Sequence, residues 1–519
     1  MNDSNMKKTE LIYNHVSLWD RHHAECVEVA LRAKAVGSRV LFLSCKGMLL
    51  GCPVNPHRNK NLCSKCVKQT ERTENILGKY GIETYSIESG HESIDLITPD
   101  SREALLDFLY DGMPIGRTVF NNVSTILGDV FVDATNEFVH DVLRNAIALF
   151  NFVKHFVEKN QVNKVSVWNG RRSCDGAVVL AAKRLGVEHS VFISGAKLMS
   201  VSEIDGTVAF QDLPHHRSKL KELYDRFEEK NDWDVVKDEA SKFYSMARGS
   251  EVDVYKPYGM GVFSKSFVAS PNVFGDSGKK KLAVFVGTYL EIAGVDGFDE
   301  NLNVEYGNFY EAVRRICTDE EILANCKVVV RWHPNILIKV RGNELSKLRH
   351  VVEETSNNVT HLLPDDPYDS YKLLSDSDVA ISVGSTMAVE AAYIKKKIIF
   401  IGNNIFDEFS FPVISKHQQL VSHLVSGLNY DLERAYKESL VYGYYRLNRY
   451  SFLIERVRYA ERNKYRSTYS VDNHIFIDKK AGLYLLRLAV YRVGLTNVIK
   501  TLLGYFKSLT TRTKNITLQ

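Results

Sequence analysis

The feature that most constrains the fold is a series of short apolar runs in the second half of the chain, separated by segments of helical character. There are four such runs: Leu282–Val286, Val328–Trp332, Val379–Val383 and Ile398–Ile401. Runs of this length and composition are typical of parallel strands buried on both faces, since the crossover helices of βαβ units cover the sheet. The pattern predicts an α/β domain with a parallel sheet.

A similar alternation occurs earlier in the chain. Its predicted strands are Leu11–Asn14, Arg39–Ser44, Lys164–Trp168 and Ser190–Ser194. Its predicted helices are His23–Val36, Asp133–Lys159 and Cys174–Leu185. The two series together predict two doubly wound, Rossmann-type domains facing a cleft, with a C-terminal helical extension.

A chain of 519 residues is too long for a single hydrophobic core. We expect an N-terminal domain over residues 1–270, with a cysteine-rich insertion at 45–66, a second domain over 271–440, and a helical basic tail over 441–519. The formal net charge of +4, from 67 basic and 63 acidic residues, does not indicate a nucleic-acid partner. The polar N-terminus and the lack of a long apolar window predict a cytoplasmic protein.

Candidate binding residues follow the strands of the second domain, where ligands of open α/β sheets bind. Arg331, His333 and Pro334 come at the end of Val328–Trp332. Because proline ends a strand, we expect His333 at the carboxyl end of the sheet, where it can donate a hydrogen bond to a phosphate. The alternative is a histidine whose hydrogen bonds are satisfied within a turn.

The turn Gly384-Ser385-Thr386 opens the helix predicted over Met387–Ile394. Such a turn presents unpaired backbone N–H groups to an anion, and Ser385 or Thr386 can add a hydroxyl. Glu390 shares a helix face with Thr386 and can accept hydrogen bonds from ribose hydroxyls. The alternative is a capped helix with a solvated glutamate. The pair Gly287 and Thr288, after Leu282–Val286, is a weaker third candidate.

In the first domain, Asn169, Gly170, Arg171 and Arg172 follow the strand Lys164–Trp168. Two arginines at a strand end suit an anionic substrate or a phosphate. Arginines are also common in surface loops. This turn therefore predicts either a substrate contact or an ordinary solvated loop.

Four cysteines, Cys45, Cys52, Cys63 and Cys66, fall within one short stretch. Four thiolates can complete a tetrahedral structural zinc site, although the spacing between Cys45 and Cys52 is looser than in a typical zinc ribbon. An iron–sulfur cluster is a second alternative and four reduced cysteines a third. We expect no cofactor in catalysis.

Three motifs in the second half of the chain resemble those of bacterial capsular-polysaccharide glycosyltransferases of the GT-B architecture. They are Arg331-Trp-His-Pro, Ser375-Asp-Ser-Asp, and Ser382-Val-Gly-Ser-Thr with Glu390-Ala-Ala. A His-Pro pair followed by a Ser/Thr-rich turn recurs in bacterial sialyltransferases, Kdo transferases and teichoic-acid glycerophosphotransferases. The resemblance covers roughly residues 280 to 405 and implies a donor nucleotide bound by His333, Ser385, Thr386 and Glu390.

The same resemblance implies an acceptor bound by the first domain, through Asn169 and Arg171. The acidic Asp/Glu-Asp/Glu-Gly motif of the sialyltransferases is missing; Asp111-Gly112 and Asp205-Gly206 match it only in part. An inverting transfer needs a general base. Asp20, His22 and His23, after the first predicted strand, are the candidates, and capping of the helix is the alternative for Asp20.

The resulting expectation is a transferase that moves a sugar from a nucleotide-sugar donor to a capsule-type or O-antigen-type polysaccharide, or to a lipid-linked acceptor. The alternatives are a glycerophosphate-type transferase, a sugar-nucleotide epimerase and a non-catalytic capsule-assembly subunit. From Lys479 onward there are eight Lys or Arg and no acidic residue. This tail predicts either contact with the inner face of the membrane or a helix that packs back on the first domain.

Overall fold

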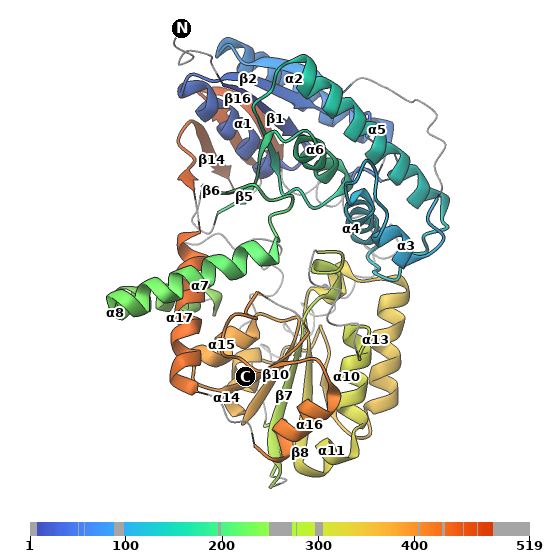
Figure 1. Cartoon of the computed structure of the whole chain (residues 1–519), viewed down its shortest axis with the longest axis vertical. Coiled ribbons are helices and arrows are strands. Elements are labelled where there is room, and N and C mark those ends of the chain that lie inside the picture. The colour runs from blue at the N-terminus through green and yellow to red at the C-terminus, as the bar shows by residue number, and fades with distance from the viewer. Residues whose placement is uncertain are drawn as a thin grey trace, which may run out of the picture. The chain divides into compact units, whose positions relative to one another are not determined.

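The computed structural model describes residues 8–49, 51–56, 58–87, 98–195, 199–248, 272–276, 278–295, 305–402, 405–427, 431–449, 451–463 and 466–480. Figure 1 shows the elements of the chain with their labels. The chain divides into two compact units. Met1–Ser89, Asn160–Asn163 and Ile454–Gln519 form the first unit, and Gly90–Lys159 and Lys164–Leu453 form the second. The domain boundaries expected at residues 270 and 440 stay predictions.

The first unit begins with alternating strands and helices. Strands β1 (Thr9–Asn14), β2 (Arg39–Ser44) and β3 (Glu83–Ser86) pair in parallel, and helices α1 (Asp20–Ala35) and α2 (Lys60–Lys79) connect them. β1 and β2 are almost wholly buried along their length, as their apolar sequences predict. The positions of β1, α1 and β2 agree with the sequence pattern to within a few residues, whereas α2 and β3 were not predicted.

Residues 452–480, which were expected to be helical, form strands instead. β14 (Val457–Asn463), β15 (Arg466–Val471) and β16 (His474–Lys480) make an antiparallel sheet. Asp472 and Asn473 both have positive φ angles, 44° and 68°, as the two-residue turn of a tight hairpin requires. This turn chemistry decides the structure of the segment. The rest of the expected helical tail, residues 481–519, lies outside the described residues.

The buried carboxylate of Glu28 on α1 joins this antiparallel sheet to the rest of the first unit. It accepts hydrogen bonds from the backbone N–H groups of Glu455 (3.3 Å), Arg456 (2.9 Å) and Val457 (2.9 Å). Glu28 is 0% exposed. Three backbone donors therefore compensate for the burial of this charge-bearing group.

The second unit starts with helices α3 (Arg102–Leu106), α4 (Ile115–Leu127) and α5 (Glu137–Lys159). Strands β4 (Lys164–Trp168) and β5 (Glu188–Ser194) are parallel and flank α6 (Ser173–Arg184), whereas β6 (Ser200–Asp205) and β13 (Phe452–Leu453) add antiparallel pairs. α5 begins four residues later than predicted. The reason is that Asp133 accepts hydrogen bonds from the N–H and hydroxyl of Thr135 in a local turn before the helix.

Six parallel strands form the other sheet of this unit, in the order β12-β11-β10-β7-β8-β9. They are β7 (Lys280–Val286), β8 (Cys326–Trp332), β9 (Thr360–Leu362), β10 (Val379–Val383), β11 (Lys397–Ile401) and β12 (Val413–Ile414). The chain builds outward from β7 to β9 and then returns to build outward from β10 to β12. The predicted α/β class, with doubly wound parallel strands, is confirmed.

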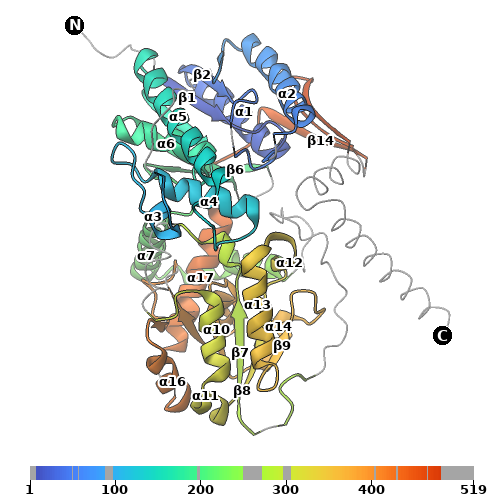
Figure 2. The same ribbon diagram turned by 90° about the vertical axis from the view of Figure 1, so that its right-hand side faces the viewer.

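Helices cover both faces of this six-stranded sheet. α10 (Phe309–Thr318) and α13 (Gly342–Thr355) lie on one side of β7, and α14 (Ser370–Asp376) and α15 (Met387–Tyr393) lie on the other (Figure 1). Figure 2 shows α10 and α13 next to each other. The remaining helices of this region are α11 (Glu320–Asn325), α12 (Ile336–Lys339), α16 (His417–Val425) and α17 (Leu432–Asn448).

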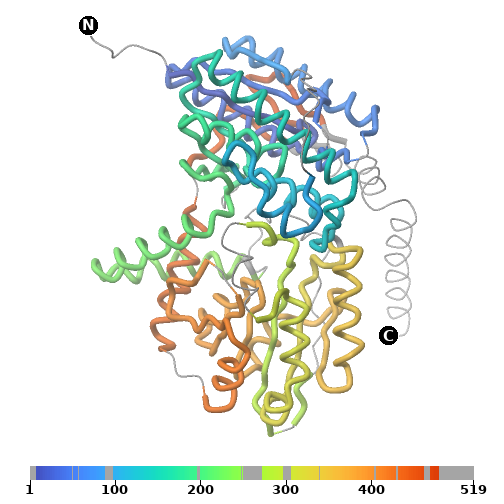
Figure 3. Tube along the Cα trace, turned by 45° about the vertical axis from the view of Figure 1, so that its right-hand side comes forward, coloured from blue at the N-terminus to red at the C-terminus, as the bar shows by residue number. Residues whose placement is uncertain are grey.

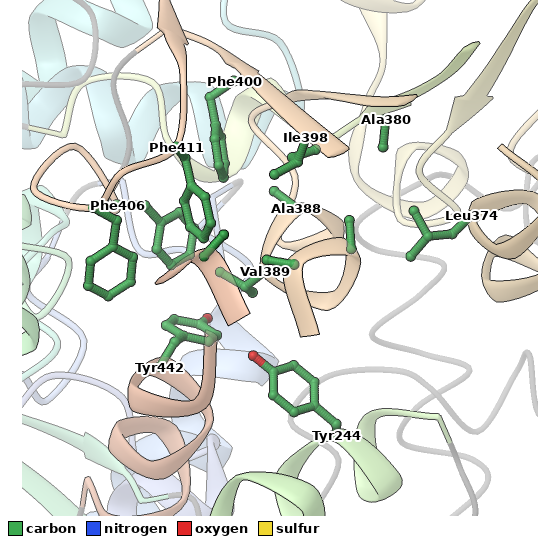
Figure 4. Packing of buried hydrophobic residues seen from close by; sticks show 14 of the residues in the cluster. Tyr244, Leu374, Ala380, Ala388, Val389, Ile398, Phe400, Phe406, Phe411 and Tyr442 are labelled. Atoms are coloured by element: carbon green, nitrogen blue, oxygen red, sulfur yellow. The ribbon is translucent and has the colours of Figure 1, made fainter. Parts of the chain in front are cut away.

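A large core joins the α14 and α15 face of the sheet to α17 and to α7 (Leu213–Lys230) and α8 (Trp233–Ala247). In the tube of Figure 3, the green segment α7–α8 lies beside the orange α17. Ala388 and Ala391 are fully buried, so α15 approaches the sheet closely. Figure 4 shows Tyr244 and Tyr442 in this core, below Val389. Within the described ranges, no helix has both the length and the apolar character that crossing a membrane requires.

Candidate functional site

The carboxyl ends of β10, β7 and β8 lie next to one another along one edge of the sheet. β10 and β7 are neighbours, and on either side of this pair the chain adds strands in opposite directions. The backbone N–H of Gly287, after β7, donates to the carbonyl of Val383 in β10 at 2.8 Å. The N–H of His333, after β8, donates to the carbonyl of Val286 at 3.1 Å. At such a switch point the flanking connections leave in opposite directions, which opens a crevice where ligands bind. Three of the motifs singled out in the sequence therefore lie side by side.

Two glycines, Gly287 and Gly384, directly follow β7 and β10. A Cβ placed on Gly287 would overlap the carbonyl oxygen of Gly384, and a Cβ on Gly384 would overlap the ring of Phe309. Gly384 also has a φ of +63°, a conformation that other residues rarely adopt. Only glycine fits at either position, because the space that a side chain would need is filled by the Gly384 carbonyl and by Phe309. The two glycines therefore allow the ends of β7 and β10 and the helix α10 to pack closely.

His333 is held in one tautomer. Its Nδ1 accepts a hydrogen bond from the backbone N–H of Asn335 at 3.0 Å, so the proton of the neutral ring lies on Nε2. Burial lowers the pKa of His333, against a raising effect of the nearby Glu291. The side chain is thus a neutral donor at pH 7. Among the described residues, no acceptor contacts Nε2.

An ion pair that the sequence did not predict lies beside His333. Lys339 on α12 pairs with Glu291, the last residue of the 3₁₀ turn η2 (Tyr289–Glu291), and the Asn335 amide donates to the same carboxylate at 3.4 Å. Burial raises the pKa of Glu291 and Lys339 lowers it, and the net shift is downward. Glu291 is therefore ionised at neutral pH. No local motif marks it, because its partner is 48 residues away.

Ser385 and Thr386 differ in what they offer. The hydroxyl of Ser382 accepts from the Ser385 N–H at 3.1 Å and donates to the Ser385 carbonyl at 2.6 Å. The Ser385 hydroxyl accepts from the N–H of Met387 at 3.3 Å, so it caps the start of α15. Thr386 is exposed and makes no capping hydrogen bond. α15 has only seven residues, so its dipole adds little here.

Glu390 lies behind this turn as a buried carboxylate. Burial raises its pKa to about 7, although a hydrogen bond from Tyr371 and the charge of Arg248 both lower it. Its Oε2 has no hydrogen-bond partner among the described residues. The same holds for the buried hydroxyl of Thr288, next to Gly287. Two buried polar atoms in this region thus lack a partner, as expected where a polar ligand supplies the missing bonds.

Tyr371 and Arg248 are the neighbours that lower the pKa of Glu390. The guanidinium of Arg248 lies over the rings of Tyr371 and Tyr393, 5.3 and 5.8 Å from their centroids. Tyr371 comes from α14, Tyr393 from α15, and Arg248 follows α8. No local motif marks Tyr371 or Arg248, because separate segments of the chain bring them to Glu390.

The guanidinium of Arg331 binds protein groups in this structure, and its expected contact with a donor stays a prediction. Its guanidinium donates to the carbonyls of Leu363 (2.7 Å) and Asp366 (3.2 Å) and to the hydroxyl of Ser370 (3.4 Å). It thereby satisfies the loop between β9 and α14, and it is only 6% exposed. Its neighbour Pro334 follows the end of β8 and precedes α12, as predicted.

Arg171 also binds protein rather than open solvent. Asn169 and Gly170 both adopt the left-handed conformation, with φ of 67° and 75°, which turns the chain sharply after β4. Arg171 then donates to Asn121 on α4 and to the carbonyls of Leu290, Glu291 and Ala293. The expected contact between Arg171 and an acceptor is therefore not what this arrangement favours. The Asn169 side-chain oxygen is buried without a partner among the described residues.

A small cavity lies next to this turn. Its lining comes from α4, from the turn after β4, from the segment before α7 and from the loop after β7: Arg117, Asn121, Gly170, Val208, Asp212 and Gly294 are among these residues. Two arginines, Arg117 and Arg171, and the carboxylate of Asp212 lie among polar and apolar neighbours in this lining.

The three candidates for a catalytic base lie in the first unit. Asp20 is the first residue of α1, but Trp19 holds the capping position. The ring of His22 packs edge-on against Trp19, with centroids 5.2 Å apart. His23 is fully buried, its Nε2 lies 2.7 Å from the Thr73 hydroxyl, and burial lowers its pKa to about 3. His23 is a core residue in this structure, whereas roles for Asp20 and His22 stay predictions.

The four cysteines of the predicted metal site are free thiols close to one another. Burial raises the pKa of Cys45 to about 11 and that of Cys52 to about 12. Cys63 accepts a hydrogen bond from the Asn55 amide at 3.0 Å. Across the described ranges, no three His, Cys, Asp or Glu side chains are arranged to hold a metal ion. The thiols as placed do not form a ligand set, and the zinc site stays a prediction.

Comparison with known proteins gives distant structural likenesses. A β-Kdo 2,7 transferase of Thermosulfurimonas dismutans, KpsC, is 14% identical with a TM-score of 0.32, over 56% of this chain and 80% of its own. MnaA of S. aureus with UDP is 13% identical with a TM-score of 0.27, over 86% and 93%. UDP-GlcNAc 2-epimerase of Neisseria meningitidis bound to UDP-GlcNAc is 10% identical with a TM-score of 0.27, over 86% and 97%. No protein-family model and no curated protein matches the sequence.

Proposed function

We propose that this protein is a glycosyltransferase that binds a nucleotide-sugar donor at the switch point of its six-stranded sheet. The observation that supports the proposal best is the meeting of three strand ends there, with Gly287 against Gly384 and the Nε2 donor of His333 beside them. Ligands of open α/β sheets bind at such a switch point, and a neutral N–H donor suits a diphosphate oxygen.

The position of Glu390 supports a nucleoside next to that diphosphate. Its Oε2 lacks a partner among the described residues, and ribose hydroxyls are donors that would supply the missing hydrogen bonds. Tyr371 also donates a hydrogen bond to this carboxylate, and Arg248 lies close by. We propose that Glu390 receives the ribose.

In the transfer step, the bond between the anomeric carbon and the diphosphate oxygen breaks while a bond to an acceptor oxygen forms. Negative charge then grows on the departing diphosphate. His333 would donate a hydrogen bond to it, and Lys339 would contribute positive charge close by, partly offset by Glu291. The acceptor proton requires a base, for which Asp20 and His22 stay the candidates. The resemblance to capsule-synthesis enzymes makes a surface polysaccharide or a lipid-linked glycan the proposed acceptor.

Nucleotide binding is the first test. A thermal-shift screen with CMP, CDP, UDP and GDP should give stabilisation by one nucleotide family, with the diphosphate bound more tightly than the monophosphate. His333→Gln should reduce that preference. If none of the four nucleotides stabilises the protein, the proposed function is wrong.

Incubation with the matching nucleotide sugar alone then separates the reaction classes. A transferase consumes the donor only slowly, by hydrolysis, until an acceptor is added. Release of an epimerised nucleotide sugar without an acceptor would show an epimerase instead. Turnover of a CDP-linked glycerol would show a glycerophosphate-type transferase.

A further inference from the structure

The loop 289–295, which follows β7 and carries Glu291, is bound by residues of α4 and of the turn after β4. Arg171 donates from Nη1 to the Glu291 carbonyl (2.5 Å) and from Nη2 to the carbonyls of Leu290 (3.0 Å) and Ala293 (3.4 Å). Its Nε donates to the Asn121 amide oxygen at 2.5 Å. One guanidinium therefore satisfies three carbonyls of the loop.

Asn121 on α4 completes the attachment. Its amide nitrogen donates to the carbonyl of Gly294 at 2.9 Å. Gly294 has a φ of +74°, and a Cβ there would lie 2.7 Å from the ring of Phe120 and 2.9 Å from the Asn121 amide nitrogen. The loop thus lies directly on α4, with four of its carbonyls bound by two side chains.

The other end of α4 fastens a second segment. After α4 ends, the Gly128 carbonyl accepts from the N–H of Arg341 at 2.7 Å, and Asp129 accepts from the N–H of Asn343 at 2.6 Å. Arg341 lies two residues after α12, the helix that carries Lys339, and Asn343 lies at the start of α13. Figure 2 shows α4 close to the end of α13 that follows this segment. Both partners of the ion pair between Glu291 and Lys339 are therefore held from α4.

We propose that Arg171 is a positioning residue which, together with α4, holds Glu291 beside Lys339 and His333. The consequence for catalysis rests on the proposed function, whereas the attachment itself does not. A planar guanidinium with several fixed donors can bind three carbonyls and an amide at once, and a lysine cannot. The proposal therefore requires arginine at this position.

The charged groups that face His333 are Glu291, which raises its pKa, and Lys339 and Arg331, which lower it. Displacing Glu291 should therefore lower the pKa of His333. Glu291→Gln removes the charge directly. If Arg171 acts by holding Glu291, Arg171→Ala should lower this pKa as well, and the double variant should lower it no further than Glu291→Gln alone.

The test uses the full chain in two measurements. Hydrogen exchange should be at least about tenfold faster over residues 289–295 in Arg171→Ala and Arg171→Lys, while β7 and β8 keep their protection. NMR of labelled histidines should give the pKa of His333 in the same variants and in Glu291→Gln. Arg184→Ala, which removes an exposed arginine paired with Asp111 at 3.0 Å, is the matched control and should change neither.

Wild-type exchange and a wild-type His333 pKa in Arg171→Ala would overturn the proposal. So would full retention of both properties in Arg171→Lys, because a lysine cannot bind the four acceptors. Failure of every nucleotide to bind the wild-type protein would instead count against the proposed function alone. The two measurements need no ligand and would still decide the role of Arg171.

Discussion

Replacing Glu390 with glutamine should make the protein more stable and at the same time weaken nucleotide binding. Burial raises the pKa of Glu390 from 4.5 to about 7, so the folded state binds this proton more tightly than the unfolded state does. The contribution of Glu390 to stability is therefore largest below pH 4.5 and falls as the pH rises towards 7. At 1.36 kcal/mol per pH unit, burial of this carboxyl group costs about 3 kcal/mol at pH 8 and about 1 kcal/mol at pH 5.

Glu390→Gln should remove this cost and keep the hydrogen bond from Tyr371. Urea unfolding at the two pH values should show a gain of up to about 3 kcal/mol at pH 8 and about 1 kcal/mol at pH 5. Nucleotide affinity, measured by calorimetry at pH 8, should fall about 10- to 100-fold, as expected for the loss of hydrogen bonds to a charged acceptor.

Glu344 provides the matched control. Burial also raises its pKa to about 7, and it accepts a hydrogen bond from Tyr310 at 2.8 Å, on α13 rather than on α15. Glu344→Gln should give the same dependence of stability on pH and leave nucleotide affinity within about twofold. A stability gain in Glu390→Gln that is equal at both pH values would refute the reasoning. So would nucleotide affinity that stays at the wild-type value.

Three other predictions concern Gly287, His333 and the cysteines of the predicted zinc site. Gly287→Ala should destabilise the protein by at least about 1–3 kcal/mol in urea unfolding, because its methyl group meets the Gly384 carbonyl; wild-type stability would show that the two strand ends are not in contact. His333→Gln should weaken a nucleoside diphosphate about tenfold or more and leave the nucleoside unchanged, and equal losses for both would place His333 elsewhere. Wild-type protein should contain zinc by elemental analysis, and Cys63→Ser with Cys66→Ser should lose it; a metal-free wild type would end the zinc prediction.

The strands could be predicted because their signal is local. β4 and β10 begin and end at the predicted residues, and Gly287, His333 and Gly384 could be assigned to one edge of one sheet. Parallel strands buried on both faces leave a continuous apolar run in the sequence. The carboxyl ends of those runs then fix which polar residues can line the crevice.

The contacts that depend on distant neighbours could not be predicted. Arg331 follows the same apolar run as His333, but its guanidinium is used by the loop after β9, a strand of only three residues that left no clear signal. Arg171 was correctly placed at a strand end, and yet only the packing of α4 shows that its donors bind the loop after β7. A sequence pattern locates a side chain on an element, whereas its partner depends on the tertiary arrangement.

The site combines two carboxylates whose protonation is controlled in opposite directions. The pKa of Glu291 is lowered, with Lys339 opposing the effect of burial, so it stays ionised across pH 5–8. Burial raises the pKa of Glu390 to about 7, and the charge of Arg248 opposes this effect only in part. The charge beside His333 is thus constant, while the charge expected at the ribose changes near neutral pH. Nucleotide affinity should therefore increase from pH 6 to pH 8, and this dependence should flatten in Glu390→Gln. Ionisation of a terminal phosphate would give a similar rise, but the Gln variant would keep it, so the comparison assigns the titrating group.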